Sequence, residues 1–182
     1  MKKNFFFFAM TAATLGFTGM VNAGDTLGTY EMQVTGNVLP QGACVVTAPS
    51  SLSFDNISPE DISLVGNGPK HDNLYLIEIS GCRKDLKVSA TVLGVADSIN
   101  NELLSTQMVP GAAENVAVAF YEQVGNAHPV VAINTGHTSS STINEFGTAQ
   151  IIMQADVVLA DYTKRATPGT IAANANVQIN FL

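Results

Sequence analysis

Apolar and polar residues alternate with a period of two over most of this chain. Tyr30, Met32 and Val34 alternate with polar neighbours near the N-terminus. The same alternation, or a short β-branched run, returns at 74–79, 86–92, 116–120, 130–133 and 150–159. The longest stretch covers 171–181, with apolar residues at the odd positions and Asn or Gln at the even positions from 174 to 180. A period of two predicts half-buried strands and does not fit helices.

Clusters of glycine, proline and asparagine separate these runs and predict turns. They lie at 66–69, 110–111, 125–126, 134–136 and 168–169. Seven or eight short strands at this spacing, without a convincing helical period, predict a single all-β domain of the Greek-key sandwich type. Only segment 56–64 is compatible with one helical turn, with Ser58 as the N-cap and Pro59 as the first helical residue.

The first 23 residues have the pattern of a secretory signal peptide. A short basic start is followed by an apolar or small stretch over 5–20 and then by Val21-Asn22-Ala23, whose first and third residues suit a signal cleavage site. A membrane anchor would need about 20 apolar residues and usually a charged stop, and three threonines dilute this segment. We therefore expect cleavage after Ala23 and export of the remaining chain.

Export would place the only two cysteines, Cys44 and Cys82, in an oxidising compartment. In an oxidising compartment such a pair is expected to be bonded. The bond would close a loop of 38 residues, which in the chain-entropy model stabilises the fold by roughly 4 kcal/mol. A reactive thiol or a metal site would need a histidine or further cysteines nearby, and the sequence around these two offers none.

Charge is scarce in this sequence and mostly negative. Charged residues make up 13%, against about 25% in an ordinary domain, which excludes a coiled coil and a charge-rich disordered chain. The net charge is −7 and becomes −9 when Lys2 and Lys3 leave with the signal. Since no basic cluster occurs anywhere, nucleic acid is excluded as a partner.

The sequence also lacks the patterns of catalytic and metal sites. The three histidines lie in turn-rich stretches without ligand spacing. The acidic group Asp55, Glu60 and Asp61 lacks the alternating oxygen ligands of a calcium loop. No zinc motif, nucleophile elbow or phosphate-binding loop is present. We predict that the protein is not an enzyme and needs no cofactor or metal.

The alternating segment before the first cysteine fits two interpretations. Residues 29–35 could be the first strand of their own domain. They could equally be a free extended segment that adds a strand to another molecule, with main-chain hydrogen bonds giving affinity and alternate side chains filling pockets. The residues alone leave both interpretations open.

Several segments, taken in order and spacing, resemble the pilins of chaperone–usher fimbriae of the type 1 family. They are Met32-Gln33-Val34-Thr35-Gly36-Asn37-Val38, Ala43-Cys44-Val45-Val46, Ile79-Ser80-Gly81-Cys82, Asn101-Glu102-Leu103-Leu104, Val116-Ala117-Val118-Ala119-Phe120 and Pro168-Gly169-Thr170-Ile171-Ala172-Ala173. The last of these runs into a strand with a penultimate aromatic residue, Phe181. The family usually has tyrosine there, so Phe181 keeps the ring and loses the hydroxyl.

The resemblance implies an incomplete immunoglobulin-like Greek-key sandwich that a donor strand completes in trans. It divides the chain into a signal peptide (1–23), an N-terminal donor-strand extension (24–36) and a pilin domain (37–182). The implied donor positions are Tyr30, Met32, Val34 and Gly36. The implied acceptor and chaperone-binding strand carries Val177, Ile179, Phe181 and Leu182, whose carboxylate basic residues of the chaperone would hold.

The resemblance also implies a function, partners and a location. The function is that of a structural fimbrial subunit that polymerises by donor-strand exchange and supports cell adhesion. The partners are a periplasmic immunoglobulin-like chaperone, an outer-membrane usher and neighbouring pilin subunits, and the location is a fimbrium on the bacterial surface, reached through the periplasm. The alternative is a minor tip, adaptor or adhesin-type subunit, although such adhesins usually carry an additional lectin domain for which 24–182 leaves no room. A periplasmic chaperone is usually basic, two-domain and longer.

Overall fold

The computed structural model describes residues 29–36, 44–54, 56–70 and 73–182. The regular elements in these ranges are all β-strands. The described residues therefore contain no helix long and apolar enough to cross a membrane. The strands are β1 Thr29–Gly36, β2 Val45–Thr47, β3 Ser51–Ser53, β4 Asn73–Ser80, β5 Lys87–Gly94, β6 Leu104–Ser105, β7 Val116–Glu122, β8 Ser141–Thr142, β9 Ala149–Leu159 and β10 Asn174–Phe181.

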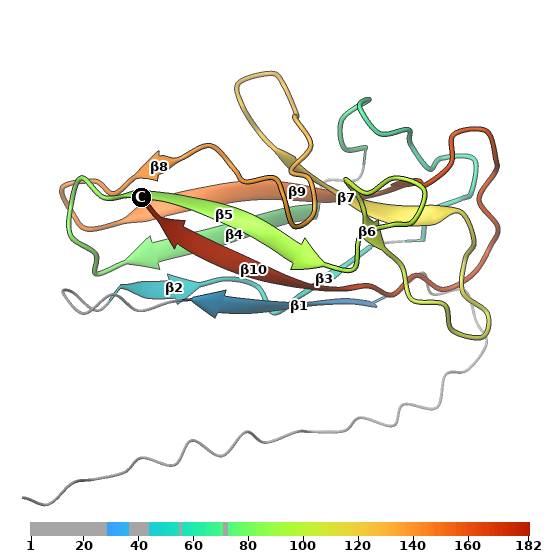
Figure 1. The fold of residues 1–182 in the computed structure, drawn as a ribbon, viewed down its shortest axis with the longest axis horizontal. Coiled ribbons are helices and arrows are strands. Elements are labelled where there is room, and N and C mark those ends of the chain that lie inside the picture. The colour runs from blue at the N-terminus through green and yellow to red at the C-terminus, as the bar shows by residue number, and fades with distance from the viewer. Residues whose placement is uncertain (1–28, 37–43, 55, 71–72) are drawn as a thin grey trace, which may run out of the picture.

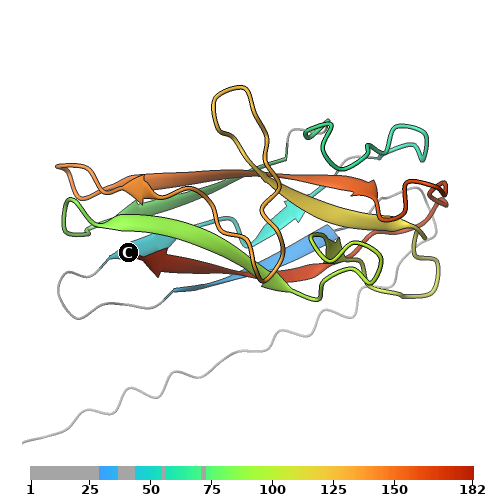
Figure 2. The same ribbon diagram turned by 45° about the horizontal axis from the view of Figure 1, so that its top comes forward.

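The strands form two sheets that face each other (Figures 1 and 2). One sheet has the order β3-β1-β10-β5-β8 and the other the order β2-β4-β9-β7-β6. Neighbours in the sequence often lie in opposite sheets, as β4 and β5 do, and every pairing except that of β1 with β10 is antiparallel. The all-β Greek-key sandwich predicted from the alternation is confirmed.

The core lies between the sheets and follows the predicted period of two. On β10 the inward residues Ala175, Val177 and Ile179 are buried, while Asn174 and Asn176, which alternate with them, are exposed. The opposite sheet contributes buried large side chains from β4, β7 and β9, among them Tyr75, Phe120 and Met153. Alternation therefore places one face of each strand in the core.

The disulfide joins the beginning of β2 to the end of β4. Cys44 and Cys82 are bonded, with an S–S distance of 2.05 Å and a Cα–Cα distance of 4.6 Å. β2 pairs with β4 from Val45↔Ser80 onwards, so the bond closes the end of an existing antiparallel pair. It holds the point at which the N-terminal segment joins the domain.

A second, smaller apolar cluster covers the outer face of the β7–β9 pair. Its buried members are Leu103, Ala117, Ala119, Tyr121, Val158 and Ala160. Segment 63–70 is tied to this face by Asp156, which is fully buried and accepts hydrogen bonds from Ser63 Oγ (3.0 Å) and the Lys70 N–H (2.8 Å). Burial, with a contribution from the Asp156 charge, raises the pKa of Tyr121 to about 12.

Three local predictions from the sequence need correction. Segment 130–133 is not a strand, because it makes only one isolated bridge, from Val130 to Tyr121. β10 starts at Asn174 and not at 171, because the Ala172 carbonyl accepts a hydrogen bond from the loop residue Gln107. Segment 56–64 contains a single hydrogen-bonded turn, Asp61 N–H to Ser58 O at 2.8 Å, and no helix.

Removal of the disulfide should lower stability substantially. We expect the double variant Cys44→Ser, Cys82→Ser to lose roughly 2–5 kcal/mol of unfolding free energy, because the unfolded chain regains the freedom of the 38-residue loop. Urea unfolding of the purified domain measures this loss, and the reduced wild-type chain is the matched control. An unchanged urea midpoint would contradict the prediction.

Candidate functional site: the strand slot beside β10

One edge of β10 is paired with a strand that follows the disulfide-closed loop. β5 runs antiparallel to it, from Ala175↔Gly94 to Phe181↔Val88. The ladder continues past the strand, because the Leu182 N–H donates to the Lys87 carbonyl at 2.8 Å. The last residue of the chain is therefore held at the sheet, although its side chain is 69% exposed.

The other edge of β10 is filled by β1. The two strands run parallel, in a register from Glu31↔Asn174 to Gly36↔Ile179. On its far side β1 pairs antiparallel with the three-residue strand β3, for example Tyr30↔Leu52. We call the position between β3 and β10 the β1 slot.

The floor of the β1 slot is the hydrophobic core. Leu52 of β3 and the inward residues of β10 belong to the main core cluster. In the observed register Met32, Val34 and Gly36 lie beside Ala175, Val177 and Ile179, and Tyr30 lies beside Leu52. Each of the four positions proposed from the sequence as a donor stripe is therefore aligned with an inward-facing position of either β10 or β3.

The four positions proposed for the accepting strand differ in their surroundings. Val177 and Ile179 are buried in the core, and Phe181 is partly buried and packs against its end. Leu182 follows the strand and contributes its backbone. The sequence interpretation missed Leu52 as the opposite wall of the slot, because Ser51–Ser53 is too short to show a period.

The outward face of β10 is polar. The Asn180 side chain donates to Thr91 Oγ1 at 2.9 Å, and the Gln178 side chain donates to Asn180 Oδ1 at 3.1 Å. The described ranges contain no group of three or more His, Cys, Asp or Glu placed to hold a metal ion. The arrangement can therefore bind one extended strand, with main-chain hydrogen bonds along both of its edges and the apolar core beneath it.

Comparison with known proteins shows which family has this architecture. The family described as fimbrial protein matches residues 32–181, from within β1 to the end of β10. The chain belongs to the fimbrial protein family. It is thus a fimbrial subunit, a structural type of protein that associates with other pilin subunits in a surface pilus.

Solved structures agree with this assignment at the level of the fold. The P pilus rod subunit PapA is similar with a TM-score of 0.55 and 17% identity, over 76% of this chain and 99% of PapA. The Burkholderia pseudomallei antigen and type I fimbria protein BPSL1626 is similar with a TM-score of 0.51 and 18% identity, over 78% of this chain and 98% of that one. A sequence comparison with curated proteins finds no significant match.

The two faces of β10 should respond differently to mutation in this fimbrial subunit. Ile179→Ala should lower the unfolding free energy by about 2–5 kcal/mol, because it opens a cavity under the β1 slot. Asn180→Ala, one residue away on the outer face, should cost about 1 kcal/mol, the worth of an ordinary hydrogen bond. Urea unfolding measures both, and equal losses would contradict the assigned faces.

Proposed function

We propose that the fimbrial subunit polymerises by donor-strand exchange, in which β1 of one copy fills the β1 slot of the next. The observation that carries this proposal is that the slot, bounded by β3 and β10, is filled by a segment that precedes the disulfide-closed domain. The resulting fibre would be a surface fimbria that supports cell adhesion.

The slot cannot remain empty. Without β1, the second edge of β10 would present unpaired N–H and C=O groups beside uncovered core residues such as Val177 and Leu52. Exposed edges and apolar patches of this kind lead to aggregation. The slot must be filled by the chain's own β1, as observed, by a strand lent by a chaperone, or by β1 of another copy.

The topology favours an antiparallel strand in the exchanged state. β10 starts at one end of the sandwich and finishes at the other, where the disulfide lies and where Gly36 is aligned with Ile179 (Figure 1). An antiparallel donor would bring Gly36 to the end where β10 starts, so that unlike ends of successive copies meet and a chain can grow. A parallel donor would bring two like ends together. Antiparallel pairing is also slightly more stable per residue, so the exchange needs no nucleotide.

Before assembly the slot and the end of β10 would be held by a partner. An immunoglobulin-like chaperone in the periplasm would add its own strand beside β10 and bind the carboxylate of Leu182. An outer-membrane usher would then bring subunits together for the exchange. The partly buried Phe181, which packs at the end of the core, supports the proposal that the chaperone contacts this position.

Peptide complementation tests the donor role of β1. A chain lacking 25–36 should be destabilised, and a synthetic peptide of residues 25–36 should restore its melting temperature. A Val34→Asp peptide should fail, because an unpaired carboxylate beside Val177 costs several kcal/mol. A Thr35→Asp peptide, altered beside the outward-facing Gln178, is the matched control and should still bind.

The same substitutions in the full-length chain extend this test to assembly. Val34→Asp should abolish SDS-resistant polymer while the complex with the chaperone keeps its normal yield. Loss of that complex as well would show that β1 is only the first strand of its own domain. Rescue of the shortened chain by the Val34→Asp peptide would contradict the apolar contact assigned to Val34.

Phe181→Ala tests the chaperone contact. We expect the variant to co-purify poorly with the chaperone of its own fimbrial system, because the groove loses an aromatic anchor worth up to about 3 kcal/mol. Tyr162→Ala, which removes an exposed ring outside the two sheets, is the control. Equal recovery of both variants with the chaperone would contradict the proposal.

A further inference from the structure

The two ends of the sandwich carry unlike surfaces. The end where β10 starts, which we call the Met108 pole, has a cleft of about 420 Å³ between segments 97–99 and 105–116. Its apolar lining is open to solvent, since Ile99 is 58% exposed and Met108 fully exposed. A cleft with such exposed apolar side chains indicates a contact site.

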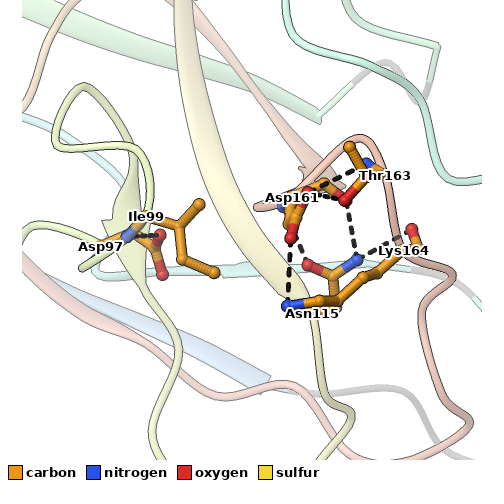
Figure 3. A network of polar contacts seen from close by, with 6 residues as sticks. All are labelled: Asp97, Ile99, Asn115, Asp161, Thr163 and Lys164. Atoms are coloured by element: carbon orange, nitrogen blue, oxygen red, sulfur yellow. Dashed lines mark hydrogen bonds and ion pairs between the residues drawn. The ribbon is translucent and has the colours of Figure 1, made fainter.

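The walls of this cleft are held in place by polar contacts (Figure 3). On one side, Asp97 Oδ1 accepts a hydrogen bond from the Ile99 N–H at 2.8 Å. On the other, the Asn115 side chain donates to the carbonyls of Asp161 and Lys164 and accepts from the Asp161 N–H. Hydrogen bonds from Thr163 and Lys164 hold the pKa of Asp161 at about 2. The cleft is therefore preformed.

The opposite end, which we call the Phe146 pole, carries an exposed aromatic side chain on a tight turn. Phe146 is 80% exposed, and its N–H donates to Asn144 Oδ1 at 2.9 Å. Gly147 has a φ of +74° and lies so close to Cys82 that an added Cβ would be 2.7 Å from the Cys82 carbonyl oxygen. The turn is thus packed against the disulfide from which the N-terminal segment departs.

We propose that Phe146 of one copy docks into the Met108-pole cleft of the neighbouring copy in the fibre. This inference rests on the proposed donor-strand function. An antiparallel donor places its Gly36 at the Met108 pole of the accepting copy. Its own Cys44 is bonded to Cys82, which pairs with Gly147 in the turn that carries Phe146. The seven residues 37–43 between Gly36 and Cys44 can span at most about 25 Å. The exchanged strand therefore keeps these two poles close together.

The side chains at the two poles are compatible with this pairing. The charged residues that line the cleft, Asp97 and Glu114, are both acidic. The exposed residues that follow Cys82 at the Phe146 pole are Arg83, Lys84 and Asp85, and the exposed Glu145 directly precedes Phe146, so this pole carries charges of both signs. The two basic residues of this pole can pair with the acidic residues of the cleft, and an aromatic side chain that enters a cleft is typical of specific protein contacts. Because the two surfaces differ, the contact repeats from copy to copy and gives an open fibre.

Cysteine cross-linking tests the contact in assembled fibres. A chain carrying both Phe146→Cys and Met108→Cys should give a ladder of disulfide-linked multimers on a non-reducing gel after the fibres are dissociated. Each single variant should give no ladder. A chain with Met108→Cys and Val124→Cys is the matched control, because Val124 lies in the hairpin that projects from the side of the sandwich (Figure 2).

A second variant tests the same contact without adding cysteines, which could form unintended disulfides. Phe146→Ser should leave the melting temperature of the subunit unchanged, since the side chain is exposed, and should speed fibre dissociation roughly tenfold. Normal fibres with no ladder and wild-type dissociation would overturn the contact while leaving donor-strand exchange intact. Failure of the 25–36 peptide to restore the shortened chain would instead overturn donor-strand exchange, and this contact with it.

Discussion

The unpaired edge of β10 is the constraint on which the rest of the structure depends. β5 satisfies one side of this strand, and the other side needs a strand that the disulfide-closed domain does not supply. β1 meets the need with main-chain pairing to both β10 and β3 and with register positions aligned to the core. In the proposed donor-strand exchange, the pairing of this edge would be the step at which a folded subunit and a polymer compete for the same strand.

The other stabilising contacts of the domain can be described by their position relative to this slot. The disulfide fastens the start of β2 to β4, so the domain stays closed at the point where β1 departs. Hydrogen bonds link Gln178 to Asn180 and Asn180 to Thr91 on the outward face of this sheet. This face is therefore polar, and the inward face supplies the core. Asp156 ties segment 63–70 to the opposite sheet, far from the slot. In the proposed exchange, another strand would replace β1 in the slot while these contacts persist.

The sequence predicted the long strands well, because their alternation is unbroken and the turn residues between them are clear. It also singled out the stripe at Tyr30, Met32, Val34 and Gly36, which the register aligns with the core. It missed β2, β3, β6 and β8, whose two or three residues carry no period. It took 130–133 for a strand because four apolar residues resemble one, whereas tertiary contacts hold that segment as an irregular cover over β7. The cleft at the Met108 pole could not be predicted from the alternation of apolar and polar residues, because separate loops of the chain form it.

In the proposed fibre the same strand fills the same kind of slot before and after exchange, so most of the hydrogen bonds and buried area cancel between the two states. The free energy that favours the polymer must then come from what differs. One difference is the change from a parallel to an antiparallel ladder, which is small per residue. The other is a contact that exists only between copies, and the Phe146 turn opposite the Met108 cleft supplies it. A weak preference at the slot and an apolar contact at the poles would act together, because the seven residues 37–43 join them. Exchange without the contact between the Phe146 pole and the Met108 pole would be nearly balanced, and this contact would favour the polymer.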